Sequence, residues 1–209
     1  MEERGEPQVG VSPGGGGEFE LERLVLASSS PRRAEILRAV GWPFEVAAAN
    51  IDEAARGGEE VSEYVERLAC EKAEAVAEGR ASGLVVGADT VVAVGGQVLG
   101  KPADTEDARR MLRLLSGRWH DVLTGVALVR AETREVLVAH ELTRVRFAPL
   151  TDGEIDWYVA TNEPADKAGA YAVQGRAALF IEEIEGDYWN VVGLPVRLVY
   201  KLAEESHRS

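Results

Sequence analysis

The segment LVVGADTVVAV, from Leu84 to Val94, limits the possible folds more than any other part of the chain. It is almost entirely apolar and β-branched, which is typical of a strand buried on both faces of a sheet. Asp89 interrupts it, and a carboxylate among apolar neighbours is costly unless it is hydrogen-bonded, paired or bound to a metal. Asp89 therefore makes a structural hydrogen bond or faces a site, and we favour the site. Gly87 allows another backbone to approach nearby.

The composition favours one globular α/β domain. The chain has 209 residues and is 45% hydrophobic, which is enough to bury a sizeable core. Its net charge of −13 argues against binding to nucleic acid or to an anionic membrane. No stretch is long and apolar enough to cross a membrane. An anionic ligand would therefore need a local cluster of cations.

The single cysteine and the N-terminal segment suggest where the protein works. Cys70 is the only cysteine, so an intrachain disulfide is impossible and a cytoplasmic location is expected. We interpret Cys70 as a helix-packing residue rather than a catalytic thiol. Residues 1–21 are acidic and glycine-rich and lack the apolar core of a signal peptide. We predict a disordered extension over 1–21 and one domain over 22–205.

The rest of the chain mixes strand and helix patterns. Strands are expected at Leu24–Ala27, Phe44–Ala47, Leu84–Val94, Val122–Val129, Val136–Phe147 and Leu179–Ile184. Helices are expected from Pro31 to about Gly41, at Val61–Glu78, at Asp104–Leu115, after a capping box of Thr151 and Glu154, and at Pro195–Ala203. Together they predict a twisted mixed β-sheet flanked by helices.

The segment ASSSPRR, from Ala27 to Arg33, joins the end of a strand to the start of a helix. Free N–H groups and the positive end of the helix dipole attract anions at such a junction. Arginine suits phosphate because its planar fork can bond two oxygens. Arg32 and Arg33 are therefore candidate phosphate ligands. The alternative, equally weighted from this segment alone, is two solvated arginines paired with Glu35 or Glu53.

Two lysines are further candidates. Lys72 lies at the centre of the apolar stripe of its helix, where a lysine must snorkel, pair or reach into a cleft. Lys101 lies on a stiff turn, Gly100-Lys101-Pro102, just past the buried strand. If these lysines joined Arg32 and Arg33, they would supply the cations that the global charge lacks.

The loop DKAGAYAVQG, from Asp166 to Gly175, offers a cation, an aromatic ring and an amide. Lys167 adds to the cationic set. Gln174 could bond a base edge as donor and acceptor. Tyr171 could stack on a base, but packing on the core is the slightly favoured interpretation. The acids Glu53 and Asp89 could hold a divalent ion.

Eight segments together resemble a known family. They are ASSSPRR, Ile51-Asp52-Glu53, Glu71-Lys72-Ala73, GADTVV, Gly100-Lys101-Pro102, LSGRWHDVLTGVAL, EPADKAGAYAVQG and GDYWNVVGLPV. In this order, across about residues 22 to 203, they resemble the Maf family of nucleoside triphosphate pyrophosphatases, in its dTTP/UTP branch. The resemblance implies an elongated, twisted mixed sheet with helices and two lobes around a cleft, similar to inosine triphosphate pyrophosphatases.

The resemblance also implies a reaction and its site. The reaction would convert dTTP, UTP and modified pyrimidine nucleotides to the monophosphate and pyrophosphate with Mg²⁺ or Mn²⁺, and the family suggests a homodimer. By motif, Asp89 would accept a proton, Glu53 and Asp89 would bind the metal, and Arg33, Lys72 and Lys101 would surround the phosphates. Substrate binding and choice would fall to Ser28, Arg32, Thr90, Lys167 and Gln174. Ala172 departs from the glycine often found in this branch, which bears on base preference.

Two alternatives stay open. One is the other Maf branch, which acts on N7-methyl-GTP. The other is a nonenzymatic nucleotide-binding regulator of cell division, which would bind dTTP without consuming it. The pair of acids, Glu53 and Asp89, argues against a pure binder, because carboxylates beside phosphates are unfavourable unless they do chemistry.

Overall fold

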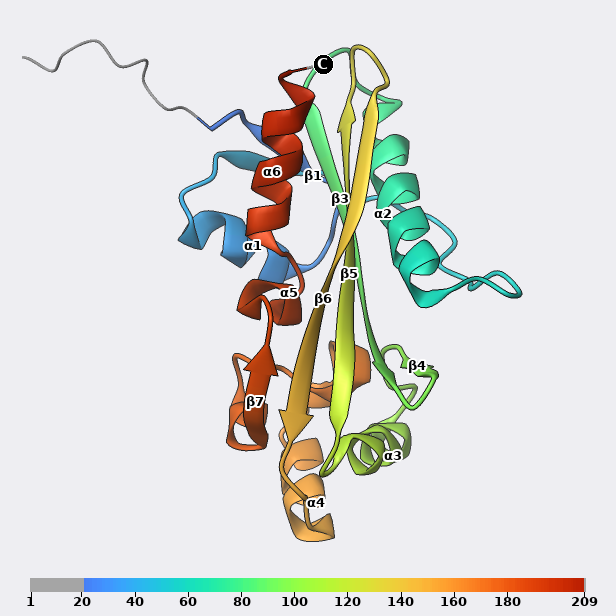
Figure 1. The fold of residues 1–209 in the computed structure, drawn as a ribbon, viewed down its shortest axis with the longest axis vertical. Coiled ribbons are helices and arrows are strands. Elements are labelled where there is room, and N and C mark those ends of the chain that lie inside the picture. Colours follow the sequence, from blue (N-terminus) through green and yellow to red (C-terminus); the bar gives the residue numbers. More distant parts are fainter. Residues whose placement is uncertain (1–20, 209) are drawn as a thin grey trace, which may run out of the picture.

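The computed structural model describes residues 21–208 and is organised around one seven-stranded mixed sheet (Figure 1). The strands are β1 (Leu24–Leu26), β2 (Phe44–Val46), β3 (Leu84–Val94), β4 (Gln97–Leu99), β5 (Trp119–Arg130), β6 (Val136–Phe147) and β7 (Ile181–Glu185). Their order is β2-β1-β3-β5-β6-β7, and β4 pairs with β3. β1 runs parallel to β2 and β3, whereas β3, β5, β6 and β7 pair antiparallel. The predicted mixed sheet is confirmed. Residues 1–20 of the predicted extension lie outside the described residues.

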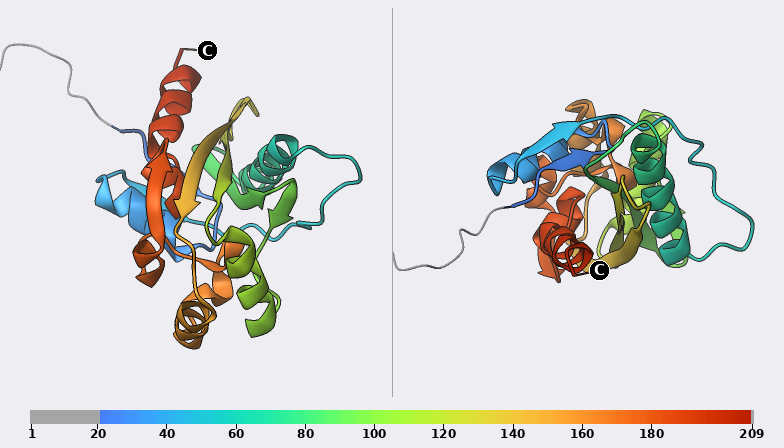
Figure 2. Two further views of the ribbon diagram at one scale, coloured as in Figure 1. Left: turned by 60° about the horizontal axis from the view of Figure 1, so that its bottom comes forward. Right: turned by 90° about the horizontal axis from the view of Figure 1, so that it is seen from above.

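Helices cover both faces of the sheet. They are α1 (Pro31–Ala39), α2 (Val61–Ala77), α3 (Thr105–Leu115), α4 (Asp152–Ala160), α5 (Tyr188–Val192) and α6 (Val196–Ser206), with 3₁₀ turns η1 (Glu163–Asp166), η2 (Ala168–Ala170) and η3 (Arg176–Leu179). α2 lies along one face, and α1, α5 and α6 lie on the opposite face (Figures 1 and 2). No helix of the described part is long and apolar enough to cross a membrane.

The predicted elements agree with the structure except in short segments. The capping box of Thr151 and Glu154 is present at the start of α4. The last strand starts at Ile181 rather than Leu179, because residues 176–179 form a 3₁₀ turn. The short elements β4 and α5 were not expected. β4 follows a tight turn in which Gly95 and Gly96 both have positive φ, a conformation that glycine adopts easily.

α2 packs unusually closely on the sheet because two strand positions carry no side chain. A Cβ at Gly87 would lie 2.1 Å from the carbonyl oxygen of Ala69, and one at Gly125 would lie 2.2 Å from that of Val65. The layer between helix and sheet consists of small residues: Val25, Ala27, Ala69, Ala73, Ala77, Val85, Ala127, Val129 and Ala131. This close contact brings the α2 side chains within reach of β3.

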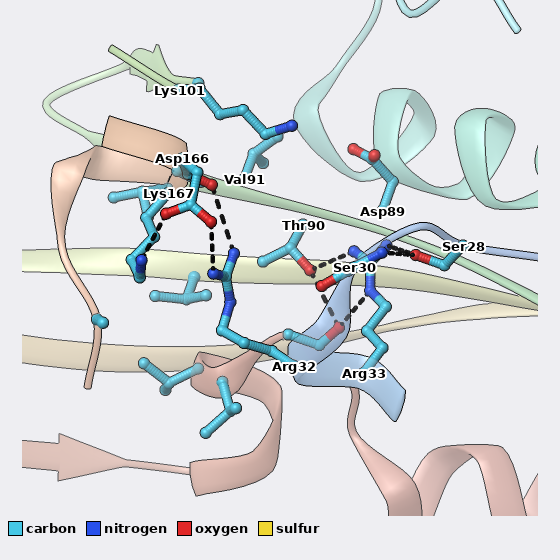
Figure 3. A pocket seen from close by; sticks show the side chains of 18 of the residues that line it. Ser28, Ser30, Arg32, Arg33, Asp89, Thr90, Val91, Lys101, Asp166 and Lys167 are labelled. Atoms are coloured by element: carbon cyan, nitrogen blue, oxygen red, sulfur yellow. Dashed lines mark hydrogen bonds and ion pairs between the residues drawn. The ribbon is translucent and has the colours of Figure 1, made fainter. Parts of the chain in front are cut away.

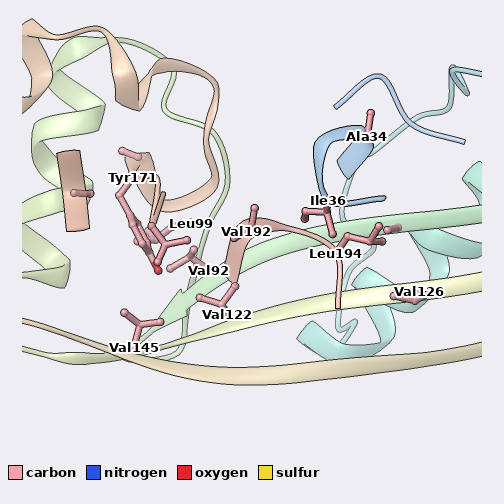
Figure 4. Close-up of a cluster of buried hydrophobic side chains, with 14 of the residues drawn as sticks. Ala34, Ile36, Val92, Leu99, Val122, Val126, Val145, Tyr171, Val192 and Leu194 are labelled. Carbon is pink, nitrogen blue, oxygen red and sulfur yellow. The ribbon is translucent and has the colours of Figure 1, made fainter. Parts of the chain in front are cut away.

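The opposite face carries the larger core, part of which is drawn in Figure 4. Near α1 it contains Ile36 and Leu194, and towards the other end it contains Val122 and Tyr171. There the ring of Tyr171 packs edge-on against Phe147, with 4.9 Å between ring centroids. One continuous core therefore supports both the start of α1 and the loop that follows α4.

Candidate active site

A gap along one edge of β3 creates the main pocket. On this edge β3 pairs with β1 over residues 84–86 and with β4 over residues 92–94. Between them the strand edge is open, so side chains from both faces of β3 can reach one space. A pocket of about 490 Å³ lies there. All ten residues singled out from the sequence line it: Ser28, Arg32, Arg33, Glu53, Lys72, Asp89, Thr90, Lys101, Lys167 and Gln174.

Lys72 joins the two acids of the pocket. Its Nζ lies 2.6 Å from Asp89 Oδ1 and 2.7 Å from Glu53 Oε1. Lys72 and Asp89 are only 8% and 9% exposed, so their charges are weakly screened. Lys72 therefore pairs within the cleft instead of snorkelling to solvent. Asp89 is both paired and turned towards the pocket.

Glu53 is held in its charged form. Its pKa lies below its ordinary value, chiefly because of the hydrogen bond from Lys72, with further help from the charges of Lys101 and Arg33. The loop that carries it is tied to α2, since the Tyr64 hydroxyl donates to the Glu53 carbonyl at 2.9 Å. Glu53 thus stays ionised at neutral pH.

Arg33 is buried and bonded in three directions (Figure 3). Its Nη1 donates to Ser28 Oγ at 3.0 Å, its Nη2 to Thr90 Oγ1 at 3.1 Å, and its Nε to the Gly193 carbonyl at 2.8 Å. Burial lowers the pKa of Arg33, although an arginine stays protonated at neutral pH. All three partners are neutral, so the guanidinium keeps its positive charge for a ligand. The alternative of a solvated arginine paired with Glu35 or Glu53 is wrong for Arg33.

Asn190 connects the C-terminal segment to the sheet by hydrogen bonds. This segment supplies the Gly193 carbonyl. The Asn190 amide is fully buried and donates to the Val122 carbonyl at 2.9 Å and to Thr143 Oγ1 at 3.0 Å. Thr124 lies opposite Thr90 in the sheet, and their hydroxyls are 2.9 Å apart. These contacts fix the partners of Arg33 to the central strands.

Arg32 points away from Arg33 to the other end of the pocket (Figure 3). Its Nη1 donates to Asp166 Oδ2 at 3.1 Å. Lys167 Nζ donates to the other oxygen of Asp166 at 2.5 Å and to the Glu163 carbonyl at 2.8 Å. The pKa of Asp166 lies below its ordinary value, chiefly because of the bond from Lys167. One exposed carboxylate therefore joins two predicted ligand-binding cations, and pairing of Arg32 with Glu35 or Glu53 is not observed.

The turn that carries Lys101 is attached to the loop that carries Lys167. The Gly169 amide donates to the Gly100 carbonyl at 3.0 Å. Gly169 has a φ of +67°, and a Cβ there would lie 2.9 Å from Val92 Cγ2. Only glycine fits this contact without strain. One backbone hydrogen bond thus links the turn that carries Lys101 to the loop that carries Lys167.

Two weaker predictions about single residues are also resolved. Tyr171 is 6% exposed, and its hydroxyl lies 2.9 Å from His120 Nε2, so the core-packing interpretation is confirmed. Cys70 is half-buried on α2 against the small-residue layer. Burial raises the pKa of its thiol to about 11, which agrees with a packing role because the thiolate is the reactive form.

Several pocket residues were not singled out from the sequence. Tyr64, Asp166 and Gly193 all line the pocket. Asp166 and Gly193 lie inside quoted motifs, but nothing in those motifs indicates that one would pair with Arg32 and the other would accept from Arg33. The only sequence feature that pointed to an ion pair here was the acid next to a cation at Asp166-Lys167.

Three acids line the pocket, but Asp166 pairs with Arg32 and Lys167 at the other end from Glu53 and Asp89. Within residues 21–208, no group of three or more His, Cys, Asp or Glu side chains could hold a metal ion. Glu53 and Asp89 remain the only acidic pair predicted for this role. An ion here would need most of its ligands from water or from a bound substrate.

The fold and the pocket define an α/β protein with an open mixed sheet and a cleft lined by five cations: Arg32, Arg33, Lys72, Lys101 and Lys167. A family model described as "Maf-like protein" matches residues 23–206. The chain belongs to the Maf family.

Named relatives and one solved structure agree with this membership. The chain is 60% identical over 176 residues to a dTTP/UTP pyrophosphatase of Symbiobacterium thermophilum, covering 84% of this chain and 90% of the relative. It is 54% identical over 177 residues to a dTTP/UTP pyrophosphatase of Hahella chejuensis, covering 83% and 87%. The structure of the Staphylococcus aureus Ham1 protein matches with a TM-score of 0.52 at 13% identity, covering 88% of this chain and 100% of that one. This likeness shows the fold alone and agrees with the expected inosine triphosphate pyrophosphatase-like architecture.

Proposed function

We propose that this protein hydrolyses the α–β bond of dTTP, UTP and modified pyrimidine nucleoside triphosphates, releasing pyrophosphate and the monophosphate. The observation that carries the proposal is one pocket lined by five cations and three carboxylates, two of which, Glu53 and Asp89, both pair with Lys72. Its volume of about 490 Å³ suits a small ligand. The names of the relatives that are 60% and 54% identical support the choice of dTTP and UTP.

Asp89 is assigned as the general base. Water must attack the α-phosphorus in line with the departing pyrophosphate, so one group must orient it and take its proton. Asp89 Oδ1 is held by Lys72, which fixes the carboxylate. A carboxylate has a second oxygen with its own acceptor sites, and this oxygen can accept the proton.

The cations would stabilise the charge that moves onto the phosphate oxygens. Arg33 is pre-oriented by three hydrogen bonds, and Lys72 and Lys101 line the same space. Charges that are already in place act strongly in a closed site because nothing has to reorganise. Ser28 and Thr90 hold the guanidinium of Arg33 and present hydroxyls beside it.

The residues present fit a divalent ion that arrives with the substrate. Oxygens of Glu53 and Asp89 converge on one ammonium nitrogen, at 2.7 and 2.6 Å, so both can face a single cation. Magnesium is commonly held by one or two carboxylates together with substrate phosphates. Glu53 and Asp89 would therefore hold Mg²⁺ or Mn²⁺, which would neutralise phosphate charge and acidify water when bound.

The base and sugar would meet the other end of the pocket. Arg32 and Lys167 lie at that end (Figure 3), and Gln174, on the same loop as Lys167, also lines the pocket. The exposed amide of Gln174 offers both a donor and an acceptor to a base edge. A homodimer and a cytoplasmic location remain predictions of the sequence.

A substrate panel tests the proposal. Pyrophosphate release is measured from dTTP, UTP, dCTP, GTP and N7-methyl-GTP, each with Mg²⁺, with Mn²⁺ and with a chelator. We expect dTTP and UTP to react fastest and the chelator to stop the reaction. Fastest release from N7-methyl-GTP would support the other Maf branch. Tight binding of dTTP without turnover in Mg²⁺ would support a regulator instead.

A further inference from the structure

The segment from Glu163 to Arg176, here called the base loop, carries Gln174. Two side chains form hydrogen bonds with its backbone. These are Tyr158, on α4, and Glu163, at the start of the loop. Neither belongs to the described residues that line the pocket. Their contacts are therefore with the loop itself rather than with the cleft.

Hydrogen bonds link this pair to the loop backbone on both sides of Gln174. Glu163 Oε1 accepts from the Tyr158 hydroxyl at 2.9 Å and from the Arg176 amide at 2.9 Å. The Tyr158 oxygen in turn accepts from the Ala172 amide at 3.1 Å. Ala172 and Arg176 are the residues two before and two after Gln174. The pair thus fixes a short arch with Gln174 at its centre.

The arch is wrapped tightly around the carboxylate. A Cβ at Gly175 would lie 2.1 Å from Glu163 Oε1, so a side chain at this position would displace the acid. The Gly175 amide also donates to the Ala172 carbonyl at 3.0 Å. Gly175 is therefore needed for the close approach of backbone to carboxylate.

Tyr158 is buried and Glu163 is partly buried, so the bond between them is costly to break. Tyr158 has no exposed surface, and the Glu163 side chain is 16% exposed. Burial raises the pKa of Tyr158 well above its ordinary value, so its hydroxyl stays protonated and donates to Glu163. Removing one partner would leave buried polar groups unsatisfied.

We propose that Tyr158 and Glu163 are positioning residues that set nucleobase choice by fixing the backbone on both sides of Gln174. The inference rests on the proposed function, because it takes the base of the substrate to meet Gln174. A site that hydrogen-bonds a base discriminates only if its donor and acceptor are held in place. A loop released from the pair would let the amide of Gln174 move, and both affinity and selectivity would fall.

Arg33 and Lys72 at the phosphate end should be unaffected because other contacts hold them, and the turn of Lys101 meets the base loop at Gly169, outside the arch from Ala172 to Arg176. Arg33 is fixed by Ser28, Thr90 and Gly193, and Lys72 is fixed by Glu53 and Asp89. None of these contacts passes through Tyr158 or Glu163. Turnover at saturating substrate is therefore expected to survive the loss of the pair.

Three variants separate positioning from simple packing. Tyr158→Phe removes only the hydroxyl and keeps the ring against Phe180, 5.4 Å away between centroids. Glu163→Ala removes the acceptor, whereas Glu163→Gln keeps an oxygen for Tyr158 and Arg176. Tyr200→Phe is the matched control, because it removes a tyrosine hydroxyl that donates to Glu204 on α6.

Steady-state pyrophosphate release from dTTP and GTP gives the first measurement. Tyr158→Phe and Glu163→Ala should raise KM for dTTP about three- to tenfold with kcat within about twofold, as expected for one lost hydrogen bond. The ratio of kcat/KM for dTTP over GTP should fall by a similar factor. Glu163→Gln and Tyr200→Phe should stay close to wild type. Unchanged selectivity in both damaging variants, or an equal loss of kcat for every nucleotide, would overturn the proposal.

Amide hydrogen exchange in the free protein tests the pair independently of catalysis. The Ala172 and Arg176 amides should be protected in the wild type. Tyr158→Phe should lose protection at Ala172, and Glu163→Ala should lose it at Arg176. If the wild type released no pyrophosphate, the proposed function would fail, and equilibrium titration with dTTP and GTP would take the place of the kinetic ratio. Unchanged exchange at both amides would refute the positioning role even in an active enzyme.

Discussion

The two ends of the pocket are built differently. At the phosphate end, Arg33, Lys72 and Asp89 lie on helices and a central strand and are at most 9% exposed. At the base end, Lys167 and Gln174 lie on a loop of 3₁₀ turns, and Gln174 is exposed. Rigid elements suit chemistry that must be placed accurately, and loops tolerate change. The difference suggests that the reaction is fixed by the sheet, whereas base choice is set by a replaceable loop.

The two ends also neutralise their cations in different ways. At the phosphate end, Lys72 is paired with two acids in a buried site. At the base end, Arg32 and Lys167 share Asp166, whose side chain is 62% exposed. Water screens exposed pairs, so a ligand can displace this carboxylate more easily. This arrangement places five cations in one pocket of a chain whose net charge is −13.

The strongest test of the phosphate end is Asp89→Asn. The amide keeps the size of the side chain but cannot accept the proton, so kcat should fall at least about a hundredfold. Pyrophosphate release measures the loss, and circular dichroism checks the fold. Asp156→Asn is the matched control, since Asp156 pairs with Arg109 on the surface. Near wild-type turnover in Asp89→Asn would refute the assignment of the base.

Acid titration tests His120, a buried residue that contacts Tyr171 in the loop at the base end. Burial lowers the pKa of His120 to about 4, whereas an unfolded histidine takes up its proton near pH 6.5. Its contribution to the free energy of unfolding is therefore present above pH 6.5 and is lost as the pH falls towards 4. The loss is at most about 3 kcal/mol.

Urea unfolding at several pH values checks this expectation by comparing wild type with His120→Phe. Phenylalanine can pack against Phe147, whose ring centroid lies 5.2 Å from that of His120. The variant should lose less stability than the wild type between pH 6.5 and 4. Parallel curves for the two proteins would show that His120 is not the titrating group.

Gln174→Ala tests whether base choice is set at the base end of the pocket. Losing one hydrogen bond to the base should raise KM for dTTP by up to about tenfold, with a smaller change in kcat. Kinetics with dTTP and GTP provide the measurement. An unchanged preference between the two nucleotides would mean that Gln174 does not read the base.

The smallest effect is expected for Asp166→Asn. The Asp166 side chain, which pairs with Arg32 and Lys167, is 62% exposed, so the free energy of unfolding should change by less than about 1 kcal/mol. Thermal or urea unfolding measures it. A loss above about 2 kcal/mol would mean that the base end is locked as firmly as the phosphate end, and the contrast between them would disappear.

The sequence alone determined the longer helices and strands and the residue types of the site. The apolar run from Leu84 to Val94 is β3 with the same bounds, and the Thr151–Glu154 capping box is present, because periodicity and capping depend on neighbours in the chain. The family motifs brought forward ten residues that do line one pocket. Such patterns identify chemistry, but they do not state which groups will touch.

Only the tertiary structure decided the partners. Arg32 and Asp166 are 134 positions apart, and Arg33 and Gly193 are 160 apart, so no local rule connects them. The α5 helix was missed because it is five residues long and depends on Asn190 contacts to two distant strands. The open edge of β3, which creates the pocket, likewise follows from where β1 and β4 happen to end. Long-range packing sets these contacts, and packing is a property of the whole fold.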